Sequence, residues 1–488
     1  MHDTDNGNIV TELAPGSVTR IHLVGVAGTG MGAFAGMLKA AGYTVTGSDE
    51  NVYPPMSDML RAWGIEVFTP YAPENLDRAR PDLVIIGNVI RRVNPEATAV
   101  RERGIPQMSF PSAFGALVAA GKHAIVIAGT HGKTTTSALM GHVLAEAGLD
   151  PTFLVGGVTR NYGGNYRLGK GGYVVVEGDE YDTAYWDKGP KFLHYRATTA
   201  MLTSVEFDHA DIYRDMAHYE SAFARLGAVL PAHGTLVVAA SYPRAVEIAR
   251  ASTSARVLTY AWDRAADYRG HDAEFGEHGA RFTIDGPNGE SVRVTLPMSG
   301  FHNLENATGV YAVGRSVGLS PEAIARGLAT FAGVKRRQEP RGEPGGVLVI
   351  DDFAHHPTAV RETITAIRQR YPTRRLWAVF EPRSNTSRRN IHQAEYASAF
   401  DGASAVVLRY PEPHDKVPLD QQLDVPAIVA GLAARGVEAF GHAEVPALVA
   451  HVIERVRPGD VVLVMSNGAF GGFIPAVLAE LERPSLPE

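Results

Sequence analysis

Residues 124–137, AIVIAGTHGKTTTS, contain the pattern that decides the fold of this chain. The first four residues are apolar and indicate a buried strand, and the glycine-containing turn 129–135 follows directly. Apolar residues then recur at helical spacing from Ala138 until Gly148, where the predicted helix ends. A strand, a glycine turn and a helix in this order predict a phosphate-binding loop, because backbone N–H groups and the helix dipole face the anion.

Two residues of this loop have separate predicted roles toward a nucleotide. Lys133 is expected to reach the β- and γ-phosphates, and Thr134 to hold Mg²⁺. The spacing is GxxGKT, shorter than the usual GxxxxGK[ST] pattern, but the strand before it and the helix after it both fit. The loop residues predicted to bind the nucleotide are Gly129, Thr130, His131, Gly132, Lys133, Thr134 and Thr135.

Length and composition limit the possible function classes. The chain has 488 residues, which is enough for three domains of ordinary size. A formal net charge of −7 argues against a nucleic-acid partner, since such proteins show a basic face. The absence of cysteine excludes disulfides, a thiolate nucleophile and a cysteine-ligated metal. The N-terminus is polar and no apolar run approaches the about 20 residues that span a bilayer, so we expect a cytoplasmic protein without a membrane partner.

The first domain is predicted over residues 18–121, after a flexible leader at 1–17. Residues 28–33, GTGMGA, follow a predicted strand and match the G-x-G-x-x-G/A pattern, and Asp49 ends the next strand about twenty residues later. A further apolar strand ends at Asn88. The pattern indicates a Rossmann-like domain that binds a diphosphate-containing ligand, and from the residues alone NAD is the usual interpretation.

A central domain, predicted over residues 122–334, places acidic side chains beside the phosphate loop. A strand predicted over 174–182 contains the acids Glu177, Asp179 and Glu180, and a second one predicted over 200–213 contains His209. Ligands of open parallel sheets bind at the carboxyl ends of the strands, so these side chains are expected near the loop. Carboxylate oxygens are the ligands that Mg²⁺ prefers, and His209 offers a nitrogen ligand or a donor to phosphate.

The rest of the chain continues the α/β pattern. A hairpin is predicted around Asn288-Gly289, and His302, Asn303 and Asn306 open a helix at the end of the central domain. A third domain is predicted over residues 335–488, where strands end in polar clusters that indicate a binding face. These clusters are Asp351-Asp352 with His355-His356, residues 381–385, His414-Asp415 and Ser466-Asn467-Gly468.

Taken in order, these motifs resemble those of the Mur ligase family of peptidoglycan synthesis, over nearly the whole chain. They are GTHGKTT, the E-x-D-E acids, DHxD, GxHNxxNA, an arginine pair, DDxxHHPT and MSNG. The resemblance implies an α/β protein of three domains: Rossmann-like, then P-loop ATPase-type, then Rossmann-like. It also implies that the first domain holds the diphosphate of a UDP-sugar and not NAD. The implied UDP-sugar-binding residues are Gly25, Gly28, Thr29, Gly30, Met31, Gly32, Asp49 and Asn88.

Within the family, several stretches look most like the members that join UDP-N-acetylmuramate to the recycled tripeptide L-alanyl-γ-D-glutamyl-meso-diaminopimelate. These stretches are residues 47–57, 153–158, 207–213 and 381–386. The implied reaction transfers the γ-phosphate of ATP to the lactyl carboxylate, and the α-amine of the tripeptide then attacks the acyl phosphate. The alternatives are a member that adds L-alanine, and an NAD-dependent oxidoreductase, which leaves Lys133 and the acids unexplained.

The resemblance also implies roles for individual residues, with ATP and Mg²⁺ as cofactors. The residues implied in catalysis are Lys133, Glu177, His209, Arg337 and Asp352, of which Glu177 and His209 join Thr134 as metal ligands. Those implied to bind ATP beyond the loop are His302, Asn303 and Asn306. The third domain is expected to dock the peptide through Arg383, Ser384, Asn385, His355 and Asn467, and Arg383 suits a carboxylate because its planar fork donates two parallel hydrogen bonds.

Overall fold

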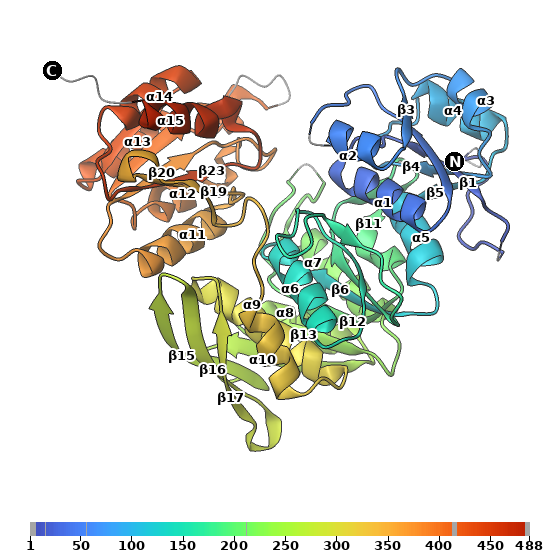
Figure 1. Ribbon diagram of the computed structural model, residues 1–488, viewed down its shortest axis with the longest axis horizontal. Helices are drawn as coiled ribbons and strands as arrows, with labels where there is room; N and C mark the ends of the chain where they lie inside the picture. Colours follow the sequence, from blue (N-terminus) through green and yellow to red (C-terminus); the bar gives the residue numbers. More distant parts are fainter. Residues whose placement is uncertain (1–5, 15, 55, 211, 412–416, 484–488) are drawn as a thin grey trace.

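The computed structural model describes residues 6–14, 16–54, 56–210, 212–411 and 417–483 (Figure 1). Three α/β units follow one another along the chain, each built on its own mainly parallel sheet. In Figure 1 the first and the last unit lie on opposite sides of the central one. The predicted α/β class with three domains is confirmed. His414-Asp415 and residues 1–5 and 15 of the expected leader lie outside the described residues.

The first sheet is parallel, in the order β3-β2-β1-β4-β5. The order reverses between β1 and β4, and an open sheet binds its ligand in the crevice at such a switch point. The strands are β1 (Arg20–Val24), β2 (Thr44–Ser48), β3 (Glu66–Phe68), β4 (Leu83–Ile86) and β5 (Gln107–Ser109). The helices are α1 (Thr29–Ala40), α2 (Met56–Ala62), α3 (Glu74–Ala79), α4 (Pro95–Glu102) and α5 (Phe110–Phe114).

Part of the segment expected to be a flexible leader is attached to this sheet. Ile9 forms a parallel bridge with Gln107 of β5. The Gln107 N–H donates to the Asn8 carbonyl at 2.9 Å, and the Val10 N–H donates to the Gln107 carbonyl at 3.0 Å. The segment therefore covers the outer edge of β5, whose backbone groups would otherwise lack partners.

The central sheet has the order β17-β16-β15-β14-β13-β12-β6-β9-β7-β8, with antiparallel pairs only at its two ends. Its strands are β6 (His123–Ala128), β7 (Thr152–Leu154), β8 (Tyr166–Arg167), β9 (Tyr173–Gly178), β12 (Ala197–Leu202), β13 (Thr235–Ala239), β14 (Arg256–Trp262), β15 (Tyr268–Gly276), β16 (Gly279–Asp285) and β17 (Ser291–Leu296). Strands β10 (Asp182–Ala184) and β11 (Asp187–Pro190) form a separate pair.

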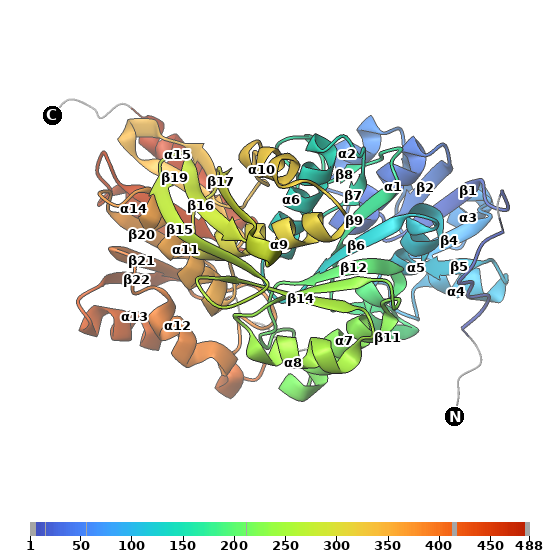
Figure 2. The same ribbon diagram turned by 90° about the horizontal axis from the view of Figure 1, so that it is seen from below.

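Helices cover both faces of the central sheet (Figure 2). They are α6 (Lys133–Glu146), α7 (Met216–Val229), α8 (Pro243–Ser252), α9 (Phe301–Ser316) and α10 (Pro321–Ala329). Alternate residues of β6 enter two different cores. Ala124 and Val126 pack in the core that includes α7 and α8, whereas Ile125 and Ile127 pack in the core of α6, α9 and α10. This two-sided burial explains why the β6 sequence is a continuous apolar run.

Two strands predicted in the central domain are shorter than expected. The sequence predicts strands over 174–182 and 200–213, but β9 ends at Gly178 and β12 ends at Leu202. After β12 the chain leaves the sheet because its side chains bind the phosphate loop. Ser204 Oγ accepts from the His131 N–H at 2.9 Å, and Thr203 Oγ1 donates to the His131 carbonyl at 2.6 Å. The predicted hairpin is present between β16 and β17, with Asn288 at φ 62°.

The C-terminal sheet has the order β18-β19-β23-β20-β21-β22 and is parallel except for β18. All four strands predicted in this region are present in it. The strands are β18 (Glu339–Gly342), β19 (Leu348–Asp352), β20 (Leu376–Phe380), β21 (Ala405–Arg409), β22 (Glu438–His442) and β23 (Val461–Met465). The helices are α11 (Pro357–Arg370), α12 (Gln393–Ala399), α13 (Val425–Ala434), α14 (Val445–Ile453) and α15 (Phe473–Glu482).

The two outer units differ in how they contact the central one. The apolar core of the first unit continues into the central unit, where Phe110 and Phe114 of α5 pack against Tyr195. The C-terminal unit has apolar cores of its own. The first unit is therefore fixed to the central one by hydrophobic packing. Among the helices that the structure describes, none is both long and apolar enough to cross a membrane.

A buried polar cluster supports the first sheet. Glu96 of α4 and His22 of β1 are both completely buried, and His22 Nε2 lies 2.6 Å from Glu96 Oε1. The same carboxylate accepts from Ser48 Oγ at 2.9 Å and from Asn75 Nδ2 at 2.9 Å. A buried carboxylate is tolerated only when it is paired and hydrogen-bonded, and here both of its oxygens have partners.

We predict that Glu96→Ala destabilises the protein by ~3–5 kcal/mol, because it leaves His22, Ser48 and Asn75 buried without their acceptor. Glu66→Ala is the matched control, since Glu66 pairs with Arg78 on the surface and such pairs contribute at most about 1 kcal/mol. Urea unfolding of the complete chain measures both variants. Equal midpoints for the two variants would contradict the expectation.

Candidate active site

The phosphate loop connects β6 to α6 and requires glycine at two positions. Gly129 has φ 128° and Gly132 has φ 78°, conformations that side chains rarely adopt. A Cβ on Gly132 would lie 2.6 Å from Asn306 Nδ2, and a Cβ on Gly129 would lie 2.3 Å from Thr203 Oγ1. Both glycines therefore allow the turn and also the close approach of Asn306 and Thr203 to the loop backbone.

Lys133 forms a buried ion pair in this structure. Its Nζ donates to the Gly129 carbonyl at 2.6 Å and lies 3.0 Å from Glu180 Oε2. Burial alone would raise the pKa of Glu180, but Lys133 and His209 lower it to about 2. Burial likewise opposes the charge of Lys133, but the charges of Glu180, Asp179 and Glu177 together outweigh it, so the pKa of Lys133 is raised. The sequence predicts Glu180 near the loop as one of three carboxylates suited to Mg²⁺, but it does not predict the pairing of Glu180 with Lys133.

The predicted metal ligands Thr134 and Glu177 lie in contact. Thr134 Oγ1 donates to Glu177 Oε1 at 2.9 Å, and the other carboxylate oxygen accepts from the Gly156 N–H at 2.8 Å. Burial, followed by the charge of Asp179, raises the pKa of Glu177. A hydroxyl beside a half-buried carboxylate is an oxygen donor set that fits Mg²⁺, which would compensate the negative charge of Glu177.

The third predicted metal ligand, His209, contacts Glu180. Its Nε2 lies 3.2 Å from Glu180 Oε1 and 3.9 Å from Asp208 Oδ2. Burial lowers the pKa of His209, but the hydrogen bond and charge of Glu180 outweigh it, so the pKa is raised. Glu180 therefore connects His209 to Lys133, and a metal-binding role for His209 stays a prediction.

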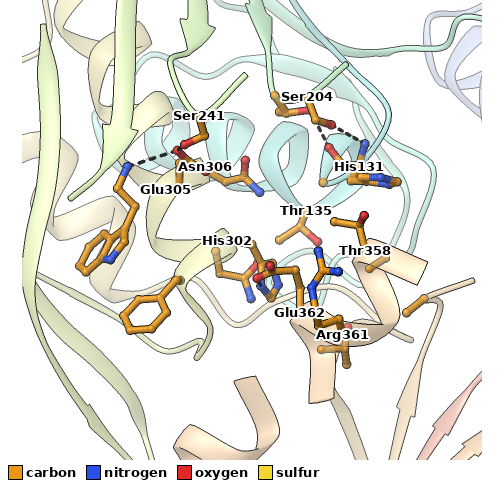
Figure 3. A pocket seen from close by; sticks show the side chains of 18 of the residues that line it. His131, Thr135, Ser204, Ser241, His302, Glu305, Asn306, Thr358, Arg361 and Glu362 are labelled. Atoms are coloured by element: carbon orange, nitrogen blue, oxygen red, sulfur yellow. Dashed lines mark hydrogen bonds and ion pairs between the residues drawn. The ribbon is translucent and has the colours of Figure 1, made fainter. Parts of the chain in front are cut away.

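A cavity of about 420 Å³ lies between the central and C-terminal units and begins at the phosphate loop (Figure 3). In Figure 3, His131 and Thr135 lie toward one side of it, with His302, Glu305 and Asn306 from α9 nearby. The predicted residues that line it are His131, Gly132, Thr135, His302, Asn303, Asn306, Arg337 and Asp352. The structure thus brings together motifs that are more than 200 residues apart in the sequence.

Sequence reasoning missed much of the cavity wall. The missed residues include the apolar side chains Tyr242, Trp262, Met298 and Phe301 and the charged side chains Glu206, Arg264, Glu305, Arg361 and Glu362. They come from different strands, helices and loops, and no spacing relates them to one another. A mostly polar lining with an apolar patch of Tyr242, Trp262, Met298 and Phe301, continuous with a phosphate loop, fits the phosphates and the base of a nucleotide.

The segment that joins the central and C-terminal units is held by Asp352. Its Oδ2 accepts from the Gln338 N–H at 2.8 Å, and its Oδ1 accepts from the Ala354 N–H at 2.8 Å. Arg337, the next residue toward the central unit, donates from Nη2 to Thr134 Oγ1 at 3.3 Å. Arg337 and Asp352 therefore lie where the C-terminal unit meets the phosphate site, and their catalytic roles stay a prediction.

The predicted UDP-sugar residues gather at the switch point of the first sheet. Residues 25–32 lie between the end of β1 and the first turn of α1, and Asn88 follows β4. Asp49, just after β2, accepts from the Ala27 N–H at 2.9 Å and so holds this glycine turn. Gly25 has φ 88°, a conformation that favours glycine. The geometry fits a diphosphate, and binding of a UDP-sugar stays a prediction.

Arg383 is exposed at the end of β20, and it does not pair with its neighbour Glu381. Glu381 instead accepts from Arg409 Nη1 and Ser466 Oγ. The Arg383 side chain lies against Gly468: a Cβ added to Gly468 would be 1.7 Å from Arg383 Nη1. Within the described part of the chain, Arg383 forms no ion pair. Its guanidinium is thus placed next to the 466–468 turn, which contains Asn467.

The other predicted peptide-binding residues have different surroundings. Ser384 Oγ donates to Ser387 Oγ at 2.8 Å, directly after Arg383 in the sequence. Asn385 belongs to the same turn after β20. His355 follows the end of a different strand, β19. Its Nδ1 lies 3.1 Å from the Phe353 carbonyl oxygen, and burial lowers the pKa of the His355 imidazole. These placements leave the peptide-binding roles as predictions.

Comparison with known proteins agrees with this architecture. Three family models match the chain: Mur ligase family, catalytic domain, at residues 20–122; Mur ligase middle domain at 127–314; and Mur ligase, glutamate ligase domain, at 336–468. UDP-N-acetylmuramate–L-alanyl-γ-D-glutamyl-meso-2,6-diaminoheptandioate ligase of Escherichia coli K12 is 38% identical over 95% of this chain and 98% of its own length. The chain belongs to the Mur ligase family.

Members of the Mur ligase family are ATP-dependent ligases that form C–N bonds. UDP-N-acetylmuramate–L-alanine ligase of Salinibacter ruber is 34% identical to this chain, over 94% of each chain. Among solved structures, a murein peptide ligase from Psychrobacter arcticus 273-4 has a TM-score of 0.70 at 31% identity, covering 96% of this chain and 99% of its own. The predicted resemblance to the Mur ligase family is confirmed.

The geometry of the Mur ligase loop predicts the effect of Gly132→Ala. The new Cβ would meet Asn306 in a strained backbone conformation, so we expect ADP to bind at least ~10-fold more weakly, a loss of about 1.4 kcal/mol. Gly163→Ala is the control, since Gly163 has φ 69° but open space around a Cβ. Isothermal titration calorimetry measures the affinity of both variants for ADP. Equal affinities would show that the close approach of Asn306 to Gly132 does not contribute to nucleotide binding.

Proposed function

We propose that this chain joins UDP-N-acetylmuramate to the tripeptide L-alanyl-γ-D-glutamyl-meso-diaminopimelate, using ATP and Mg²⁺. Relatives from Escherichia coli and Haemophilus influenzae that carry the corresponding name are 38% and 37% identical over 95% of the chain. The observation that carries the proposal is the continuity of the site: the phosphate loop, the Thr134–Glu177 contact and the cavity adjoin one another. L-alanine addition is the second candidate, because ligases of that name reach 34% identity.

The domains of the proposed enzyme would divide the substrates among them. Residues 18–121 would bind the UDP-sugar, 122–334 ATP, and 335–488 the incoming peptide, with residues 1–17 as a leader. A carboxylate is a poor electrophile, so the γ-phosphate first passes to the lactyl carboxylate to give an acyl phosphate. The α-amine of the tripeptide then attacks the acyl carbon, and phosphate leaves.

The charged residues around the loop would position and neutralise the phosphates. Lys133 exchanges its pairing with Glu180 for the β- and γ-phosphates when the nucleotide binds. Thr134 and Glu177 would hold Mg²⁺, with His209 near a second ion, and bound Mg²⁺ supplies positive charge to the phosphate oxygens. Arg337 adds a half-buried positive charge from the C-terminal side of the cavity.

Contact between the two domains would also protect the acyl phosphate from water. Asp352 holds the segment that contains Gln338 and thereby orients Arg337 toward Thr134. The cavity that receives the nucleotide is lined from both domains, so its shape depends on how they meet. The proposed role of Asp352 is therefore to orient the connecting segment beside the bound nucleotide.

The test is ATP-dependent phosphate release with UDP-N-acetylmuramate plus the tripeptide, L-alanine or no amine. We expect rapid release with the tripeptide, slow release with L-alanine and almost none without an amine. Mass spectrometry of the product shows the new amide bond. Release that is fastest with L-alanine would favour the second candidate, and the absence of release with either amine would refute a ligase of this class.

Arg383 is proposed to recognise a carboxylate of the diaminopimelate. We expect Arg383→Ala to weaken tripeptide binding by ~2–5 kcal/mol, because it leaves a desolvated carboxylate without its partner. The KM values for ATP and UDP-N-acetylmuramate should change little. Arg435→Ala is the control, since Arg435 lies on the exposed surface of the same domain and pairs with Asp401. Steady-state kinetics with each substrate varied separately measure the effect.

A tripeptide KM within about twofold of wild type, an effect below ~0.5 kcal/mol, would show that Arg383 does not recognise the diaminopimelate carboxylate. Asn467, in the adjacent turn, is then the next residue to test. An equal rise in all three KM values would indicate a disturbed domain and not a specific contact.

A further inference from the structure

Three side chains with metal-binding atoms converge where the phosphate loop meets the C-terminal domain. They are His131 of the loop, Glu206 of the segment after β12, and His356, which caps the N-terminus of α11. His131 Nε2 lies 2.9 Å from Glu206 Oε2, and His356 Nδ1 lies 3.8 Å from the same oxygen. One ligand atom from each residue lies within 4.8 Å of the other two.

The one lone pair of His356 Nδ1 already accepts a long hydrogen bond, which an ion bound at this point would replace. The Thr358 N–H donates to His356 Nδ1 at 3.3 Å, so this nitrogen is an acceptor and carries no proton. It faces the Glu206 carboxylate, which is also an acceptor. His131 Nε2 donates to Glu206 Oε2 at 2.9 Å, so an ion that binds both atoms displaces this proton. A neutral imidazole and an ionised carboxylate are the forms that bind a metal.

The cluster is held by packing on both sides of the domain boundary. The His356 ring lies 4.5 Å from the His131 ring and 4.6 Å from the His392 ring, measured between centroids. The phosphate-loop side is fixed as well, because the His131 N–H donates to Ser204 Oγ at 2.9 Å. The donor atoms therefore meet without any large movement of the chain.

We propose that His131, Glu206 and His356 form a binding site for a transition-metal dication of the Zn²⁺ class. Two imidazoles and one carboxylate are a ligand set typical of Zn²⁺, whereas Mg²⁺ prefers oxygen ligands. The site differs from the Thr134–Glu177 pair proposed for Mg²⁺, since the two share no residue. It has two ligands from the central domain and one from the C-terminal domain, so a bound ion bridges the two.

The position of the site connects it to the nucleotide cavity. His131 and Glu206 line that cavity, so the fourth coordination position of a tetrahedral ion is left for a water or a phosphate oxygen there. An ion at this point would hold the C-terminal domain against the phosphate loop. The ion is thus an external ligand that stabilises one arrangement of the domains.

The experiment titrates the full-length, untagged protein with Zn²⁺ in excess Mg²⁺, using a chromophoric chelator as competitor. We expect one Zn²⁺ per chain in the wild type and at least ~10-fold weaker binding in His356→Gln and in Glu206→Gln. His392→Gln is the matched control, because His392 touches the His356 ring but contributes no ligand atom. Its affinity should equal that of the wild type.

Two further measurements keep the result interpretable if a variant is poorly folded. Co²⁺ replaces Zn²⁺ as a spectroscopic probe, and the wild type should show the strong visible absorption of a four-coordinate ion. Zn²⁺ should raise the thermal midpoint of the wild type and of His392→Gln, but not of His356→Gln. Absence of Zn²⁺ binding by the wild type in excess Mg²⁺, or equal loss of affinity in the His392→Gln control, would overturn the proposal.

Discussion

The buried ion pair between Lys133 and Glu180 is the interaction on which the rest of the site depends. Both side chains are nearly inaccessible to water, and a buried charge without a partner is strongly destabilising. The pair connects the start of α6 to the segment after β9. Glu180 also contacts His209 at 3.2 Å, and its backbone carbonyl accepts from Tyr213 Oη at 2.6 Å. One carboxylate thus fixes the loop relative to the segment after β12.

The same pair explains how the phosphate loop keeps its shape. The Lys133 ammonium is compensated by Glu180 and by the Gly129 carbonyl, so the loop does not depend on an anion to offset this charge. A polyphosphate that enters must compete with Glu180 for the lysine. The site is therefore preorganised by charges that the protein itself supplies, and preorganised charge is the main source of stabilisation in phosphoryl transfer.

The two outer domains are attached by different physical means, which suits different tasks. Apolar packing of Phe110 and Phe114 on Tyr195 joins the first domain to the central one. The contacts around the nucleotide cavity are polar, such as His302 with Glu362 at 3.4 Å and Asp352 with the Gln338 N–H. Polar interfaces within a chain are the ones that open and close, so motion is expected at the cavity and not between the first and the central domain.

Elements that arise from local causes could be predicted from the sequence. The apolar run of β6, the glycine turn after it and the hairpin at Asn288 follow from backbone preferences and periodicity, and each is present in the structure. The contacts between side chains that are distant in the sequence are visible only in the folded chain. The ends of β9 and β12, the pairing of Lys133 with Glu180, and the meeting of His131 with His356 depend on sheet order and domain contact. No spacing along the chain encodes these contacts, because they form between segments that folding alone brings together.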